Sequence, residues 1–175
     1  MDIFNEKIIA YGLQRITELT TDIFGALLCG AIMGNIFVGF VFELAYIPLR
    51  VYAGGYHAAS EKKCKYISWG SMIGCMIIIF YVPLSAFIQH FLMALSILCV
   101  VIMSPVESIN KPLSKKEKQM FRKRSMLIMF SEVLIYCLLV LFKVEIGAKT
   151  FCIAIVLIAI GLCLGIERSE SNVLK

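Results

Sequence analysis

Cys64 and His57 are the two residues of this sequence that could together carry out covalent catalysis. Cys64 alone among the seven cysteines lies outside the long apolar runs, and Lys62, Lys63 and Lys65 flank it. Positive charge of this kind favours the thiolate, which is the nucleophilic form of cysteine. His57 lies in the same polar segment and could act as the general base. The pair is therefore a candidate for a cysteine nucleophile with its histidine.

The spacing of this pair requires a bent backbone. On an unbroken helix, seven residues would separate His57 from Cys64 by about 10.5 Å along the axis, whereas proton transfer needs a contact of about 3 Å. Gly54 and Gly55 directly precede His57 and permit unusual backbone angles. The alternative is an ordinary polar loop with an incidental histidine and cysteine, since a spacing alone is weak evidence.

The composition indicates a membrane protein. Of the 175 residues, 60% are hydrophobic and 17% are charged, against about 45 to 50% and about 25% in soluble domains. The stretch 66–106 carries no Asp, Glu, Lys or Arg. As a helix it would be about 62 Å long, which is twice the hydrocarbon thickness of a bilayer. We therefore expect an all-α, polytopic membrane fold, with residues 1–175 forming a single integral membrane domain.

The apolar segments predict how the chain is organised. Residues 1–22 carry apolar side chains at helical spacing and predict an amphipathic helix lying on the membrane. The stretch 23–49 is long for one span and short for two, and this choice stays open. Two spans are expected within 66–106 and two more over 125–142 and 150–166. The total is about five to six membrane segments.

The distribution of Lys and Arg predicts the orientation. The polar segment 50–65 and the loop 107–124 together hold eleven of these cations, while the opposite connections hold only Lys143 and Lys149. Because cytoplasmic loops carry the excess of Lys and Arg, both basic segments are expected in the cytoplasm of a multi-pass cell-membrane protein. The catalytic candidates in 50–65 would then face the cytoplasm.

The same topology argues against metal and nucleic acid. The second histidine, His90, is expected on the opposite membrane face from His57. With one nearby cysteine, the two histidines cannot supply the three or four ligands that zinc requires. The basic clusters lie at the ends of spans, where lipid and topology explain them. We expect no metal, no cofactor and no nucleic acid.

Two motifs resemble the AgrB family, the membrane-integrated cysteine peptidases of Gram-positive quorum sensing. The first is the run Arg-Val-Tyr-Ala-Gly-Gly-Tyr-His at 50–57, followed by Cys64. The second is Ser-Pro-Val-Glu-Ser-Ile-Asn-Lys-Pro-Leu at 104–113. With the amphipathic start and the hydrophobic remainder, the resemblance covers most of the chain.

The resemblance implies an enzyme that cleaves the C-terminal tail from an AgrD-like precursor peptide. Cys64 would attack a backbone carbonyl of the precursor and form a thioester, and His57 would take the thiol proton and later give it to the leaving amine. An internal thiol or hydroxyl of the peptide would then displace Cys64. The product would be a cyclic thiolactone or lactone signal.

Further residues of the segment 50–65 could assist this chemistry. Arg50 and the backbone amides around Gly54 and Gly55 are candidates for holding the oxyanion or substrate carbonyls. For Arg50, anchoring at the positive-inside face is an equal alternative. Glu61 could orient His57 if the turn is helical, or it could simply be solvated among the lysines.

The basic loop 107–124 is a candidate for binding the precursor. It has seven cations against two glutamates. Most such clusters set topology or touch anionic lipid. We predict that this one also grips an acidic precursor tail, as the family's substrates imply, through Lys115, Lys116 and Arg122.

Small residues within the apolar segments could let helices approach closely in a bilayer. Three glycine pairs have the required spacing: Gly30 with Gly34, Gly70 with Gly74, and Gly161 with Gly165. Packing within one chain is their common use, and a homodimer is also expected. Glu132 falls inside a predicted span, where a charge facing lipid would be costly. It could face a partner or a polar cavity, but we expect it to snorkel towards the cytoplasmic interface.

A second class of function stays open. The chain could be a non-catalytic membrane module that binds or exports a peptide, with the basic loops and the amphipathic helix as its docking surface. Such a module needs no reactive Cys64, so replacement of that residue distinguishes the two functions.

Overall fold

The computed structural model describes residues 2–56, 61–107 and 113–173, and six helices account for nearly all of them. Five of the helices, α2 to α6, are long and apolar enough to cross a membrane. The expected all-α polytopic fold with five to six membrane segments is therefore confirmed. The helices are α1 (Asp2–Ile32), α2 (Ile36–Ala53), α3 (Glu61–Tyr81), α4 (Ala86–Met103), α5 (Lys115–Leu141) and α6 (Glu145–Val173).

Local capping determines where several helices begin. The Asn35 side chain accepts a hydrogen bond from the Phe37 amide at 3.1 Å, which caps α2. Ser114 and Glu117 form a capping box at the start of α5, each side chain bonded to the backbone amide of the other. Such caps satisfy amide groups that the first helical turn leaves without partners.

The stretch 23–49 forms a helical hairpin. The second part of α1 and the first part of α2 are antiparallel, and the turn between them includes Gly34 with a φ of 98°. A Cβ at Gly39 would lie 2.2 Å from the Ala26 carbonyl oxygen, so the glycine lets the two backbones approach closely. The amphipathic segment expected over residues 1–22 is not a separate helix, since α1 runs unbroken from Asp2 to Ile32 and continues into the hairpin. The interfacial placement of residues 1–22 stays a prediction.

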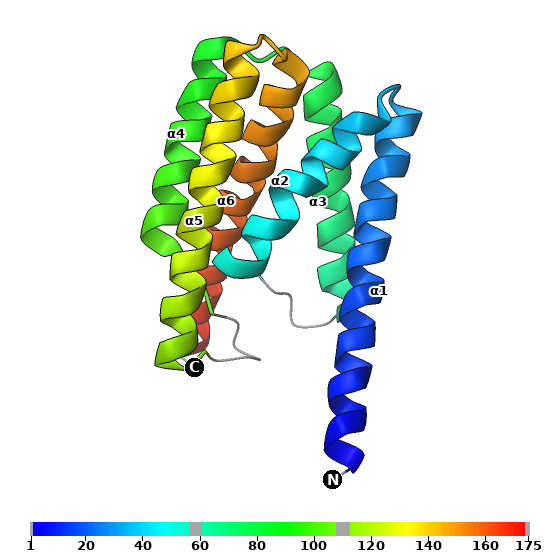
Figure 1. Cartoon of the computed structure of the whole chain (residues 1–175), viewed down its shortest axis with the longest axis vertical. Helices are drawn as coiled ribbons and strands as arrows, with labels where there is room; N and C mark the ends of the chain where they lie inside the picture. Colours follow the sequence, from blue (N-terminus) through cyan, green and yellow to red (C-terminus); the bar gives the residue numbers. More distant parts are fainter. Residues whose placement is uncertain (1, 57–60, 108–112, 174–175) are drawn as a thin grey trace.

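Helix α6 is the centre of the bundle. It packs against α2, α3, α4 and α5, and residues 150–155 are all buried. A helix that is apolar on every side is typical of such a central position. Figure 1 shows α4, α5 and α6 on one side, α1 and α3 on the other, and α2 crossing obliquely between them. Near the start of α6, Lys149 Nζ donates to the carbonyls of Ile79 and Val82 at the end of α3, both at 2.6 Å.

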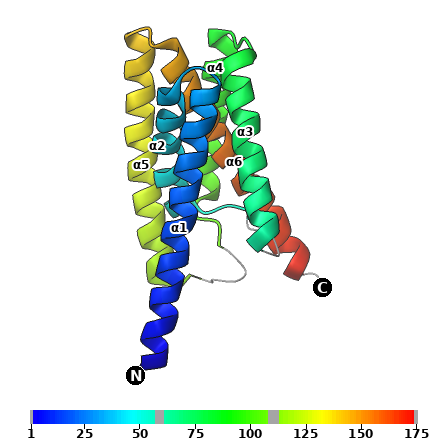
Figure 2. The ribbon, with the colours of Figure 1, turned by 90° about the vertical axis from the view of Figure 1, so that its right-hand side faces the viewer.

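Helix α1 begins and α6 ends at the same end of the bundle (Figures 1 and 2). Helices α2 and α4 end there, and α3 and α5 begin there with their lysine-rich first turns. We call this the basic end. The opposite end carries the short turns that connect α1 to α2, α3 to α4, and α5 to α6.

Glu132 corrects one expectation from the sequence. Its side chain is only 3% exposed, and neither carboxylate oxygen has a hydrogen-bond partner within the described part of the chain. The predicted snorkelling is wrong, because Glu132 lies on the same buried face of α5 as Met129 and Tyr136. Packing of that face against neighbouring helices holds the side chain inside the bundle.

Candidate active site

Two connecting segments meet at the basic end, one following α2 and the other following α4. The Val106 amide donates to the Ala53 carbonyl at 2.9 Å. Gly54 and Val106 form an isolated parallel β-bridge. A Cβ at Gly54 would lie 2.2 Å from the Val106 carbonyl oxygen, so the close approach requires glycine. The tertiary fold therefore joins the two motifs that the sequence analysis singled out separately.

Helix α6 packs against this junction through Gly161 and Gly165, and we call this surface of α6 the floor of the junction. The Tyr56 amide donates to the Gly161 carbonyl at 2.7 Å. A Cβ at Gly165 would lie 2.9 Å from the Gly55 carbonyl carbon and 3.1 Å from the Tyr56 nitrogen. Gly161 and Gly165 thus leave room for an irregular loop, whereas the sequence analysis expected such a pair to serve helix packing.

Arg50 bridges two backbone carbonyls of the turn formed by residues 54–56. It extends from the last turn of α2, and its Nη1 and Nη2 donate to the carbonyls of Gly54 and Tyr56, the latter at 2.6 Å. A Cβ at Gly55 would fall 1.8 Å from Arg50 Nη1. Gly54 and Gly55 have φ values of 77° and 132°, a region that L side chains rarely adopt. In this structure Arg50 binds the chain's own backbone, at the turn that leads to His57.

The predicted catalytic pair is only partly described. His57 lies outside the described residues and directly follows Tyr56, whose backbone Arg50 and Gly161 hold. Cys64 is half-buried in the first turn of α3, which begins at Glu61. Backbone amides in a first helical turn lack partners within the helix, so Cys64 lies beside donors suited to an oxyanion. The proximity of Glu61 to His57 stays a prediction.

The sequence model of the family described as Accessory gene regulator B (AgrB) matches residues 1–166, nearly the whole chain. The chain belongs to the AgrB family. The family takes part in processing the accessory gene regulator autoinducer from its peptide precursor, which implies an AgrD-like precursor as partner. With its five apolar helices, the chain is a multi-pass membrane protein. No curated protein and no solved structure matches the sequence.

In this AgrB protein, the start of α5 holds the second motif in place. Arg122 donates from Nη1 to the Ser104 carbonyl at 2.8 Å and from Nη2 to the Val101 carbonyl at 3.2 Å. The Ser104 hydroxyl donates to the buried Ser125 hydroxyl at 2.8 Å. Arg122 thus satisfies carbonyls at the end of α4, which the sequence analysis did not foresee when it assigned this side chain to the precursor tail.

The remaining basic side chains of this region differ in their contacts. Lys115 and Lys116 are exposed in the first turn of α5. Lys118 forms a 2.8 Å ion pair with Glu107, and surface pairs of this kind contribute little to stability. Lys115 and Lys116 therefore remain the better candidates for an acidic ligand.

Tyr52 couples the end of α2 to the start of α5. Its ring lies 5.7 Å from that of Phe121 and 5.4 Å from the Arg124 guanidinium carbon. The Arg124 side chain also donates to the Tyr52 hydroxyl at 3.3 Å. The sequence did not predict this cluster. The spacing of Gly161 and Gly165 on α6 did indicate a close approach of backbones, which in the structure is the packing of Gly165 against Gly55 and Tyr56.

A metal site requires several His, Cys, Asp or Glu side chains close together. Across residues 2–56, 61–107 and 113–173, no group of three or more His, Cys, Asp or Glu side chains could hold a metal ion together. Among the described residues, the junction presents the Cys64 thiol, backbone amides and basic side chains.

Proposed function

We propose that this protein is a membrane-embedded cysteine endopeptidase that cleaves the C-terminal tail of an AgrD-like precursor and promotes cyclisation of the remaining peptide. The observation that carries the proposal is the junction at the basic end. Arg50 and Gly161 hold the backbone up to Tyr56, the residue before His57, and Cys64 lies in the first turn of the next helix. Family membership supplies the substrate class.

The proposed reaction has two steps. In the first, Cys64 sulfur bonds to a carbonyl carbon of the precursor, the peptide C–N bond breaks, and His57 moves the thiol proton to the leaving amine. In the second, a thiol or hydroxyl within the peptide attacks the thioester and releases Cys64. Exchange of one thiol for another changes little in bond energy, so cyclisation competes well where lipid excludes water.

Arg50 has a positioning role in this proposal. Its guanidinium bridges two carbonyls of the Gly54–Tyr56 turn, and a planar fork suits such a bidentate contact. The turn positions the backbone of Tyr56, the residue that precedes His57. The Gly54 amide donates to the Arg50 carbonyl, and the Tyr56 amide donates to that of Gly161. The Gly55 amide, together with those at the start of α3, is therefore the remaining candidate for holding the oxyanion. Glu61 is retained as a candidate for orienting His57.

The basic end would also bind the precursor. We propose that it faces the cytoplasm, in accordance with the excess of Lys and Arg in its connections. Lys115 and Lys116 would attract an acidic tail, because both are exposed and belong to a loop of net positive charge. Arg122 would act on binding indirectly, through the end of α4 that it holds.

A homodimer belongs to the same proposal. Of the three glycine pairs, Gly70 and Gly74 on α3 are the one with nothing within 4 Å of a Cβ at either position. Exposed apolar residues, including Ile67 and Ile77, accompany them on α3. Small residues on an apolar helix face permit close helix association in a bilayer, so this face is the proposed dimer contact.

The decisive experiment traps the acyl-enzyme. The purified protein in vesicles, incubated with its precursor and quenched in acid, should yield a peptide joined to Cys64 through a hydroxylamine-sensitive thioester. Cys64→Ala should abolish both the adduct and cleavage, while the matched variant Cys137→Ala, which changes an exposed cysteine of α5, should retain both. Cleavage retained by Cys64→Ala would reject Cys64 as the nucleophile. Precursor binding or transport without any cleavage, in the unaltered protein and in Cys64→Ala alike, would instead support the non-catalytic binding or export module.

A further inference from the structure

A pocket lined by both apolar and acidic side chains lies between α1, α2, α3 and α6, separate from the junction at the basic end. Its empty volume is about 270 Å³, including space open to the outside, and it leaves room for about one water-sized group. Trp69 lies five residues beyond Cys64 on α3, which places the pocket about 7.5 Å deeper in the bundle along that helix. The lining residues are Asp22, Phe42, Glu43, Tyr46, Ser68, Trp69, Met72 and Leu157.

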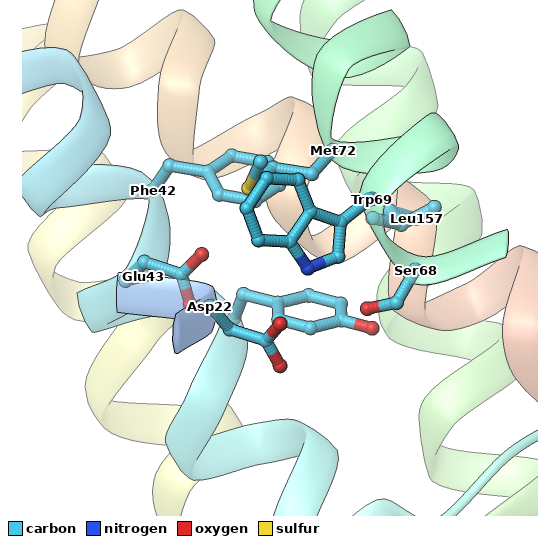
Figure 3. Close-up of a pocket in the computed structure, with 8 residues that line it drawn as sticks. Asp22, Phe42, Glu43, Ser68, Trp69, Met72 and Leu157 are labelled. Carbon is cyan, nitrogen blue, oxygen red and sulfur yellow. The ribbon is translucent and has the colours of Figure 1, made fainter. Parts of the chain in front are cut away.

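Glu43 is a buried side chain of this pocket with an unsatisfied carboxylate oxygen. Its side chain is 6% exposed, and Oε2 has no hydrogen-bond partner within the described part of the chain. Figure 3 shows its carboxylate directed into the pocket beside that of Asp22, with the Ser68 hydroxyl across the space. Trp69 Nε1 is also buried without a partner in the described residues, but it is a donor and cannot pair with a cationic donor, so Glu43 alone carries the argument. An ionisable side chain left unsatisfied inside a membrane bundle is costly, so its retention points to a ligand.

The lining defines the chemistry of that ligand. Two carboxylates face the space, two hydroxyls add hydrogen-bond acceptors, and none of the lining side chains is basic. Phe42, Met72 and Leu157 form apolar walls beside the carboxylates, and aromatic rings attract cations. A primary ammonium is water-sized, donates three hydrogen bonds and is carried on an apolar stem. A guanidinium is broader than the room available.

We infer that this pocket binds a primary ammonium group on an apolar stem, with Glu43 as its principal acceptor and Asp22, Tyr46 and Ser68 as the surrounding oxygens. The group could belong to a lysine side chain of a membrane-bound peptide or to a free alkylamine. The inference concerns binding alone, so it holds whether or not Cys64 is the nucleophile.

The pocket contains its own reporter, because Trp69 is the only tryptophan of the chain. Butylammonium chloride and Nα-acetyl-lysine amide should each change the Trp69 fluorescence of the full protein in vesicles, with saturation, at constant ionic strength. A lower half-effect concentration for the lysine derivative identifies a peptide lysine as the natural source, and a lower one for butylammonium identifies a free amine. Tetramethylammonium, which has no N–H to donate, should have no effect.

Two variants test the role of Glu43. Glu43→Gln should raise the half-effect concentration at least about tenfold, since it removes a charged acceptor. Glu132→Gln changes a buried carboxylate whose oxygens also have no partner within the described residues. Glu132 lies on α5 outside the pocket, so this variant should leave the response unchanged. Should Glu43→Gln reduce expression, Ser68→Ala provides a second pocket variant with a smaller expected shift.

Three results would overturn the inference. Absence of any saturable response to either amine would mean that the pocket holds water. An equal response to butanol would mean that it takes a neutral hydrogen-bonding group. A response in Glu43→Gln equal to that of the unaltered protein would place the amine elsewhere.

Discussion

The guanidinium of Arg50 occupies the space that a side chain at residue 55 would need. A Cβ at Gly55 would lie 1.8 Å from Arg50 Nη1, and the same nitrogen donates to the Gly54 carbonyl. The φ of 132° favours glycine at this position, and the missing Cβ leaves room for the Arg50 guanidinium to hold the turn. This relationship explains why both residue types stand just before the candidate catalytic histidine.

Gly55→Ala should abolish or strongly reduce precursor cleavage. The new Cβ would displace the Arg50 guanidinium, and the φ of 132° would add backbone strain of about 1–3 kcal/mol. Cleavage in vesicles, normalised to inserted protein, measures the effect. Gly12→Ala is the matched control, because a Cβ there meets nothing within 4 Å. Equal activity of the two variants would contradict the role assigned to the turn.

Arg50→Lys should lower the cleavage rate although the charge is kept. An ammonium cannot reproduce the planar fork that reaches the carbonyls of both Gly54 and Tyr56. If Arg50 serves only as a positive-inside anchor, lysine should replace it fully. Single-turnover cleavage with saturating precursor separates these outcomes, because positioning affects the chemical step, whereas anchoring affects only the amount of inserted protein.

Gly165→Val should inactivate the enzyme through the floor of the junction. A Cβ at this position would already lie 2.9 Å from the Gly55 carbonyl carbon, and the branched side chain would push the turn away from α6. Gly161→Ala should be milder, since its Cβ would meet only Arg50 Nη1 at 3.6 Å. Cleavage assays rank the two variants, and the opposite order would refute the packing argument.

Charge reversal should separate tail binding from support of the fold. Lys115→Glu with Lys116→Glu should raise the precursor concentration needed for half-maximal cleavage several-fold, and neutralising the acidic residues of the precursor tail should remove the difference. Arg122→Glu should impair cleavage of both precursors, because it releases the Ser104 carbonyl at the end of α4. A dependence of the Arg122 effect on tail charge would instead indicate direct contact with the tail.

Gly70→Leu should weaken self-association within the bilayer. The larger side chain would hold two copies of α3 apart if they meet at Gly70 and Gly74. Cross-linking in vesicles at several protein-to-lipid ratios measures the dimer. The control must be a glycine that tolerates a side chain, and Gly147→Leu does not serve, because a Cβ there would already lie 3.2–3.3 Å from neighbouring side chains. Gly12→Leu is preferable, because a Cβ there meets nothing within 4 Å. An unchanged dimer yield would place the contact on another face.

The sequence by itself determined the class of fold and the chemistry to look for. The spans follow from the length of the charge-free stretches relative to bilayer thickness, and capping side chains such as Ser114 act within one helical turn. Such signals are local, so they can be read along the chain. The candidate pair His57 and Cys64 was likewise evident from residue type and neighbouring charge.

Only the tertiary structure decided which residues those local elements bring together. The junction of Gly54 with Val106, the hydrogen bond from Tyr56 to Gly161, and the use of Gly165 as a floor all depend on how α2, α4 and α6 pack. Glu132 was misjudged for the same reason, since burial is a property of the helix's neighbours. These contacts join residues more than fifty positions apart, so they depend on how whole helices pack, and spacing along the chain carries no information about that packing.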